Sequence, residues 1–242
     1  MQTSSAPGHP EVLKIVAPNP GPMTLEGTTT YLFGSDPCIV IDPGDDAPAH
    51  LNAIRAAAAE RGGIGLVLLT HSHRDHSEGA EELEADVVLP GHGESHLGLR
   101  VLATPGHAAD HVSFLSETGV CFSGDLVLGL GSTIVPPGGG SLAAYMDSLA
   151  LLQAEPIDLI CPGHGPWVTD PAAKLAEYVE HRQMRERRLL AALEEGERSR
   201  AALLSTVWDD IPFELLPMAA MAMEAHLEKL EREGQLPEDL GP

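Results

Sequence analysis

Thr70-His71-Ser72-His73-Arg74-Asp75-His76 is the most informative stretch of the chain, because it contains three imidazoles and one carboxylate within six residues. It follows the apolar run 64–69, which is typical of a strand buried in a sheet that is covered on both faces. The loop at the carboxyl end of such a strand is where α/β proteins place their chemistry. Imidazole nitrogens and carboxylate oxygens are the ligands that zinc and its neighbours prefer. We therefore interpret this stretch as part of a metal site and not as a His-rich surface turn.

Three further apolar runs end in the same way, with a turn dipeptide followed by a His or an Asp. Pro105-Gly106 precedes His107, Ser123-Gly124 precedes Asp125, and Pro162-Gly163 precedes His164. Glycine permits the tight turn that each position needs. Each motif alone is an ordinary turn. Four strand ends that each deliver a metal-type ligand indicate one shared site.

This set of residues resembles the ligand set of the metallo-β-lactamase superfamily. The resemblance implies an α/β fold, a four-layer αββα sandwich, with a dinuclear metal site at one edge. One metal would be held by His71, His73 and His107. The other would be held by Asp75, His76 and His164, and Asp125 would bridge the two.

A closer resemblance is to the β-lactamase-like protein 2 subgroup, over about residues 12–234. The matching stretches are residues 19–32, 124–129, 162–166 and 181–186. This resemblance implies a catalytic domain over residues 12–170 and a small C-terminal helical, winged-helix-like appendage over residues 171–242. The chain departs from the subgroup at Thr29, where an Asn is usual, and in a shorter segment between His76 and His107.

The resemblance also implies a metal-dependent hydrolase. Two divalent ions, zinc first and manganese or iron also compatible, would generate a bridging hydroxide that attacks a small ester, thioester, lactone or amide. Asp75 would be catalytic by orienting that water. His111 follows His107 by four residues, and we predict a substrate contact there, with an orienting role or a plain polar loop residue as the alternatives.

Other functions remain open at this point: an endoribonuclease that cuts single-stranded RNA, an enzyme similar to hydroxyacylglutathione hydrolase or a β-lactamase, or a non-catalytic binding module. The formal net charge of −22 argues against extended nucleic-acid binding, because such a surface repels polyanions. We therefore expect a small-molecule substrate. The oligomeric state is not predicted by any feature of the sequence.

Composition favours a cytoplasmic protein without a membrane contact. No apolar stretch is long enough to span a bilayer, and the N-terminal residues do not resemble a signal peptide. The three cysteines are isolated in the sequence, and we expect them to be free thiols.

Periodicity and turn signals predict the remaining elements. Residues 1–11 are expected to be a poorly ordered lead, and residues 31–33 and 38–41 to be paired strands. Helices are expected over residues 50–61, 77–83, 141–152, 174–195, 199–208 and 215–233, with Ser77 capping the second of them. One helix carries Arg182, Arg185, Arg187 and Arg188. These side chains would either meet an anionic substrate or form a solvated helix face.

Overall fold

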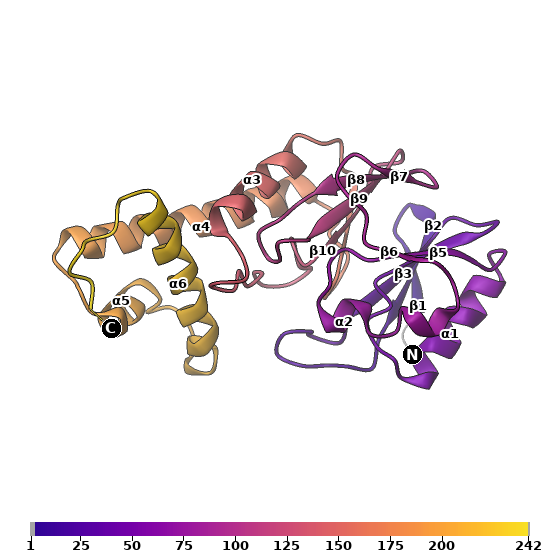
Figure 1. Ribbon diagram of the computed structural model, residues 1–242, viewed down its shortest axis with the longest axis horizontal. Coiled ribbons are helices and arrows are strands. Elements are labelled where there is room, and N and C mark those ends of the chain that lie inside the picture. Colours follow the sequence, from indigo (N-terminus) through magenta and orange to yellow (C-terminus); the bar gives the residue numbers. More distant parts are fainter. Residues whose placement is uncertain (1–2, 242) are drawn as a thin grey trace.

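The computed structural model describes residues 3–241 and shows two β-sheets packed face to face, with helices outside them and a helical unit at the C-terminal end (Figure 1). The first sheet has the strand order β1 (Thr3–Ala6), β2 (His9–Val16), β3 (Thr29–Phe33), β4 (Cys38–Ile41), β5 (Ile64–Leu68) and β6 (Val87–Val88). The second has the order β11 (Leu159–Pro162), β10 (Val120–Gly124), β9 (Val112–Ser116), β8 (Leu99–Ala103) and β7 (Ser95–His96). Neighbouring strands are antiparallel except in the pairs β4–β5, β5–β6 and β10–β11.

The alternation of side chains along β4 shows how the layers form. Ile39 and Ile41 point into the core between the two sheets, whereas Cys38 and Val40 point to the outer core beneath α1 (Pro48–Ala59). On the other side, α3 (Leu142–Gln153) and the start of α4 (Pro171–Glu194) cover the second sheet. The predicted αββα sandwich is confirmed.

The C-terminal unit, which we call the appendage, has its own apolar core. It consists of the end of α4, α5 (Arg200–Val207), the short 3-10 helix η2 (Phe213–Leu215) and α6 (Leu216–Arg232). The long helix α4 belongs to both cores: Leu175 and Tyr178 pack in the sandwich, and Leu189 and Leu193 pack in the appendage. The predicted boundary between residues 170 and 171 therefore falls at the N-terminal end of a helix that the two units share.

The prediction of a poorly ordered N-terminal lead is wrong for the residues that the structure describes. β1 pairs with β2 from Thr3 opposite Ile15, and Ala6 is buried in the core between the sheets. The polar sequence of β1 carries no apolar alternation, because this edge strand is held mainly by backbone hydrogen bonds. Residues 1 and 2 of the predicted lead, and residue 242 of the predicted appendage, lie outside the described residues.

The predicted helix over residues 77–83 is also wrong. The helix that follows the histidine-rich stretch, α2 (Arg74–Ser77), begins three residues earlier and ends at Ser77, and a separate 3-10 helix, η1 (Glu81–Leu83), follows. Ser77 Oγ donates to the carbonyl oxygen of His73 at 3.1 Å, so it does not cap a helix. Gly79 lies between the two pieces. A Cβ there would lie 2.7 Å from the carbonyl oxygen of Pro43, so the close approach of the chain to Pro43 requires glycine.

The other five predicted helices are present, with ends shifted by a few residues. Among the helices of residues 3–241, none is both long and apolar enough to cross a bilayer.

Candidate metal centre

The predicted ligands lie together at one edge of the sandwich, each just beyond the end of a strand. The first sheet supplies His71 and His73 after β5, and α2 supplies Asp75 and His76. The second sheet supplies the other three, after β8, β10 and β11: His107, Asp125 and His164. Three groups have donor atoms within 4.8 Å of one another: His71, His73 and His107; His71, His76 and Asp125; Asp75, His76 and His164. The structure thus brings together all seven residues that the sequence singled out.

Three imidazole nitrogens converge at the first of these groups. His73 Nδ1 lies 3.0 Å from His71 Nε2 and 2.9 Å from His107 Nε2. His107 Nδ1 donates to the carbonyl oxygen of Ile134 at 2.7 Å, which leaves Nε2 of the neutral ring with a lone pair. Since Thr70 Oγ1 donates to Asp42, His71 Nδ1 donates to Thr70 Oγ1, and His71 Nε2 is likewise unprotonated. Lone pairs that face each other in this way fit a bound cation.

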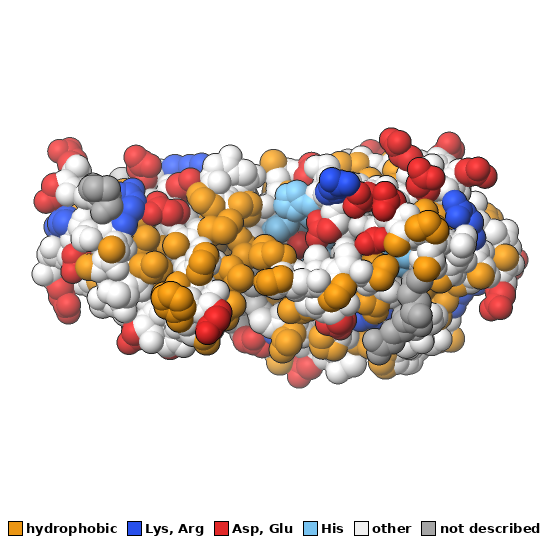
Figure 2. Space-filling model, turned by 90° about the horizontal axis from the view of Figure 1, so that it is seen from below, with side chains coloured by type: hydrophobic (Ala, Val, Ile, Leu, Met, Phe, Trp, Pro, Cys, Tyr) orange, Lys and Arg blue, Asp and Glu red, His pale blue; other side chains and the backbone are white. Residues whose placement is uncertain are grey.

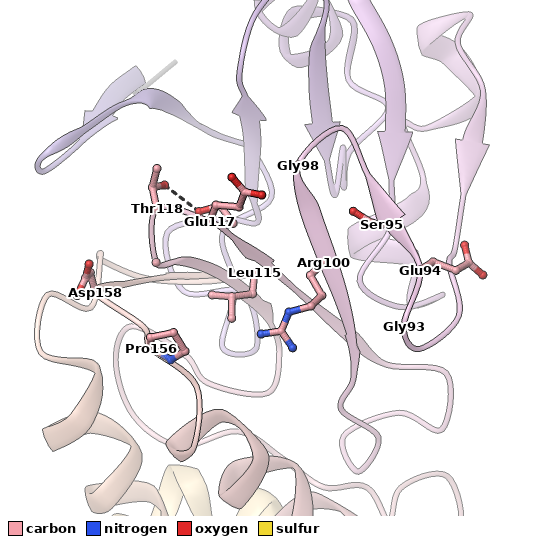
Figure 3. Close-up of a pocket in the computed structure, with 12 residues that line it drawn as sticks. Gly93, Glu94, Ser95, Gly98, Arg100, Leu115, Glu117, Thr118, Pro156 and Asp158 are labelled. Carbon is pink, nitrogen blue, oxygen red and sulfur yellow. Dashed lines mark hydrogen bonds between the residues drawn. The ribbon is translucent and has the colours of Figure 1, made fainter.

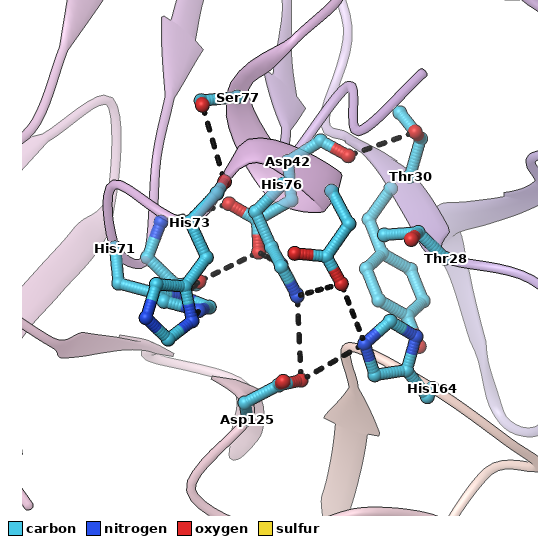
Figure 4. Close-up of polar contacts among 12 residues, drawn as sticks. Thr28, Thr30, Asp42, His71, His73, His76, Ser77, Asp125 and His164 are labelled. Carbon is cyan, nitrogen blue, oxygen red and sulfur yellow. Dashed lines mark hydrogen bonds and ion pairs between the residues drawn. The ribbon is translucent and has the colours of Figure 1, made fainter. Parts of the chain in front are cut away.

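The second group combines histidines with two carboxylates (Figure 4). His76 Nε2 lies 3.3 Å from Asp125 Oδ1 and 3.8 Å from Asp75 Oδ2. His164 Nε2 lies 3.3 Å from the same oxygen of Asp125 and 3.4 Å from Asp75. The buried atoms His76 Nε2, Asp125 Oδ1 and His164 Nε2 make no hydrogen bond, so they are free to coordinate an ion.

Asp125 lies between the two groups. Its Oδ1 faces His76 and His164, and its Oδ2 lies 3.6 Å from His107 Nε2. The residue at position 163 has to be glycine, because a Cβ there would lie 2.6 Å from Asp125 Oδ1 and 2.6 Å from His76 Cε1. The turn before His164 therefore fits under this carboxylate only without a side chain.

The charges of the cluster also favour a cation. Burial alone would raise the pKa of Asp125, but His76 and His164 hold it well below the ordinary value. Burial alone would lower the pKa of His164, but Asp125 and Asp75 raise it to about 9. The part of the cluster around Asp125, His76 and His164 therefore binds positive charge strongly, either as protons on these two imidazoles or as a metal ion.

A residue that sequence reasoning missed, Asp42, orients this centre from behind. Its Oδ1 accepts the backbone N–H of Thr70 at 2.8 Å, and its Oδ2 accepts Thr70 Oγ1 at 2.7 Å and His76 Nδ1 at 2.9 Å. The bond to His76 fixes the tautomer that leaves Nε2 free. The available signal was its place directly after β4, but the Pro43-Gly44 turn follows this acid, whereas at the other sites the turn precedes the His or Asp.

His111 is buried, and both of its ring nitrogens have partners within the protein. Its Nδ1 lies 2.9 Å from Thr104 Oγ1, and its Nε2 accepts the backbone N–H of Asp125 at 3.2 Å. Burial and the neighbouring His107 lower the pKa of His111 to about 3, so the ring is neutral. His111 therefore holds the backbone of Asp125 in place.

The predicted arginine cluster separates into two kinds of residue. Arg187 and Arg188 pair with Glu180 and Asp209 near the surface. Arg182 and Arg185 are buried, which neither interpretation of the helix anticipated.

A second hollow lies at the other edge of the second sheet, where β8 and β10 begin (Figure 3). It is a pocket of about 680 Å³ whose lining includes Arg100, Glu117 and Asp158. Arg100 pairs with Glu155 there. The metal ligands follow the opposite ends of these strands, so we assign this pocket no part in the chemistry.

Comparisons with known proteins agree with this architecture. The chain matches the family described as "Metallo-beta-lactamase superfamily" over residues 23–93 and 83–164, and the family described as "Beta-lactamase associated winged helix domain" over residues 199–239.

Individual relatives cover most of the chain. It is 34% identical to "Beta-lactamase-like protein 2 homolog" of Drosophila melanogaster, over 93% of this chain and 89% of that protein. It is 36% identical to "Atrochrysone carboxyl ACP thioesterase" of Aspergillus chevalieri, over 79% of this chain and 68% of that protein. Among solved structures, a β-lactamase domain protein from Burkholderia ambifaria superposes with a TM-score of 0.78 at 21% identity, over 96% of this chain and 89% of that chain. That last likeness concerns the fold alone.

Proposed function

The chain belongs to the metallo-β-lactamase superfamily, and from that membership we propose that it hydrolyses a small acyl substrate, a thioester or ester first, at a centre of two divalent metal ions. The observation that carries the proposal is the convergence of seven imidazole and carboxylate side chains, among which the buried atoms His76 Nε2, Asp125 Oδ1 and His164 Nε2 have no hydrogen-bond partner within the protein.

Two sets of residues would hold the ions. His71, His73 and His107 fit one ion, Asp75, His76 and His164 fit the other, and Asp125 has one oxygen toward each set. Nitrogen and oxygen donors without thiolate suit zinc, and they also suit manganese or iron. When bound, such ions supply Lewis-acid charge and lower the pKa of water toward neutrality.

Asp75 is the carboxylate best placed to handle a proton. Its side chain is 34% exposed, against 12% for Asp125, so it is the more open of the two carboxylates to solvent. Burial alone would raise its pKa, but His164 and His76 lower it below the ordinary value. An anionic carboxylate at the mouth of the site can accept a proton from the attacking water and return it to the leaving group. His111, in contrast, we assign to holding Asp125 and not to substrate contact.

An apolar surface next to the histidines supports an acyl substrate. Figure 2 shows hydrophobic side chains gathered between the histidines and the appendage. Leu25 and Leu130 lie beside Gly165, the residue after His164, and Leu130 is 63% exposed. On the appendage, Phe213 is 81% exposed. The thioesterase activity in the name of the Aspergillus chevalieri relative points to the same bond.

The endoribonuclease alternative is less favoured, because a net charge of −22 opposes the approach of a polyanion. The same test addresses the β-lactamase alternative through its β-lactam, and a glutathione thioester added to the panel addresses the hydroxyacylglutathione-type alternative.

The test is a substrate panel on protein loaded with about two zinc ions per chain. It contains acyl-coenzyme A thioesters of increasing chain length, nitrophenyl esters, a lactone, a β-lactam and single-stranded RNA. We expect the wild type to hydrolyse a thioester or an ester. Asp75→Asn should lower kcat/KM by at least about a hundredfold, as for loss of other groups that assist proton transfer. Glu78→Gln is the control. It also replaces a carboxylate by an amide, three residues along the chain at a residue paired with Arg74, and it should change kcat/KM little.

Hydrolysis of RNA alone, or no hydrolysis by the zinc-loaded chain, would contradict the proposal.

Cys38, Cys121 and Cys161 are all free and buried, which supports a reducing compartment, and we propose a cytoplasmic location.

A further inference from the structure

Two buried arginines on α4 are not used by the proposed reaction. Arg182 is 4% exposed and Arg185 is 2% exposed, and they lie three residues apart on the helix. The guanidinium of Arg182 lies 5.3 Å from the ring centre of Tyr145, and that of Arg185 lies 5.5 Å from the ring centre of Trp208. Arginine is rarely buried this deeply unless its hydrogen bonds are used, so each side chain has a structural task.

The two arginines serve different halves of the molecule. Arg185 donates to the carbonyl oxygen of Val207 at 2.6 Å and to both oxygens of Asp210 at 2.7 and 2.9 Å, all within the appendage. Arg182 donates to Ser132 Oγ at 3.1 Å and to the carbonyl oxygen of Thr133, in the loop that follows β10. Arg182 therefore ties α4 to the catalytic domain.

That loop also contacts two of the metal-type donors. Thr133 Oγ1 donates to the carbonyl oxygen of Asp125 at 2.7 Å. The next residue, Ile134, offers the carbonyl oxygen that receives the proton of His107 Nδ1 at 2.7 Å. Residues 132–134 thus lie between the guanidinium on one side and His107 and Asp125 on the other.

We propose that Arg182 is a positioning residue for the metal centre. By fixing loop 132–134, it holds the backbone of Asp125 and selects the His107 tautomer whose Nε2 is free to bind an ion. The helix that connects the appendage to the sandwich (Figure 1) therefore also supports the metal site. This inference rests on the metal centre of the proposed function and not on the identity of the substrate.

The chemistry of arginine explains why this position would not accept lysine. The planar guanidinium lies over the ring of Tyr145 while its Nη2 donates to both oxygens of the loop. A lysine ammonium keeps the charge, but it lacks the planar face that lies against Tyr145 and fixes the direction of the donor. Arg182→Lys should therefore weaken the contact with the loop.

The experiment measures metal affinity and not turnover. Zinc dissociation constants of wild type, Arg182→Lys and Arg182→Met are determined by competition with a chromophoric chelator, and cobalt(II) derivatives report ligand geometry through their visible absorption. We expect zinc binding weakened by about tenfold to a hundredfold and an altered cobalt spectrum, as for loss of other groups that orient metal ligands. Arg185→Met is the matched control: it should lower the melting temperature through the appendage and leave zinc affinity within about twofold.

A second variant keeps the test valid if Arg182→Met does not fold. Thr133→Val removes the hydroxyl that holds Asp125 without changing α4, and it should also weaken zinc binding. Wild-type affinity and cobalt spectrum in folded Arg182→Lys and Thr133→Val would overturn the inference, as would an equal loss of affinity in Arg185→Met. A wild type that binds no zinc would instead overturn the proposed function itself.

Discussion

Asp42→Asn is the substitution whose effect can be worked out most fully from the structure. Asp42 is 2% exposed and accepts three hydrogen bonds, two from Thr70 and one from His76 Nδ1. An asparagine has only one acceptor oxygen, so its NH₂ group faces either the backbone N–H of Thr70 or the two donors at Oδ2. In the second orientation His76 must accept at Nδ1, and its proton moves to Nε2, the atom that faces Asp75 and Asp125.

Both stability and metal binding should suffer. Hydrogen bonds to a charged group contribute about 1.5–3 kcal/mol each, so the cost is at least about 1.5 kcal/mol if the NH₂ group faces the backbone N–H of Thr70, and at least about 3 kcal/mol if it faces the two donors at Oδ2. For a chain of this size, a loss of about 1.5–3 kcal/mol lowers the melting temperature of the metal-free protein by about 3–12 °C. In the second orientation zinc affinity should also fall by about tenfold to a hundredfold, because a protonated Nε2 cannot coordinate.

The assay combines thermal unfolding of chelator-treated protein with zinc titration in competition with a chromophoric chelator. Asp46→Asn is the control, since it makes the same change at an exposed position four residues along. An Asp42→Asn protein that melts within about 1 °C of wild type and binds zinc equally well would refute the argument, because each kcal/mol should shift the melting temperature by about 2–4 °C.

Three further predictions concern the metal bridge, the shared helix and the pH. Asp125→Ala should reduce the metal content from about two ions per chain to one or none by elemental analysis, and an unchanged content would exclude a bridging role. A chain that ends at Asp170 loses two α4 side chains from the sandwich core, a cost of about 5 kcal/mol or more. This chain should show no cooperative thermal unfolding, whereas a chain that ends at Glu197 should unfold cooperatively. Equal melting temperatures of the two chains would contradict the claim that α4 is part of the sandwich core. Burial and two neighbouring arginines lower the pKa of His181 from 6.5 to about 4. The unfolded chain therefore binds more protons between those values, and stability falls as the pH drops from 6.5 to 4. His181→Gln should make the loss in free energy of unfolding between pH 6.5 and 4 smaller by about 1 kcal/mol after allowance for solvent screening. Urea unfolding at the two pH values measures this loss, and an equal loss in wild type and variant would show that the assignment is wrong.

The residues that converge at the candidate metal centre were predictable because each one follows a recognisable strand end. His107 and His164 come directly after Pro-Gly turns, and the apolar runs before them are long enough to identify strands. The same logic predicted the sandwich only with the help of the family resemblance, since periodicity does not say which strands share a sheet.

The residues that orient the ligands were not predictable in this way. Asp42 stands alone before an ordinary Pro-Gly turn, and its three donors come from residues about thirty positions away. Arg182 and Arg185 lie in a helix rich in charge, where the local pattern indicates a solvated face. Their burial depends on Tyr145 and Trp208, which only the tertiary fold brings over them.

The split of the ligands between the two sheets has a consequence for the lifetime of the protein. His71, His73, Asp75 and His76 belong to one layer, whereas His107, Asp125 and His164 belong to the other. Ions held between them would cross-link the layers as a disulfide cross-links two loops. By mass action, an ion present at a hundred times its dissociation constant adds about 2.7 kcal/mol to the free energy of unfolding. Chelation should therefore loosen the whole sandwich and speed its proteolysis, so that metal supply would control how much of this protein a cell retains.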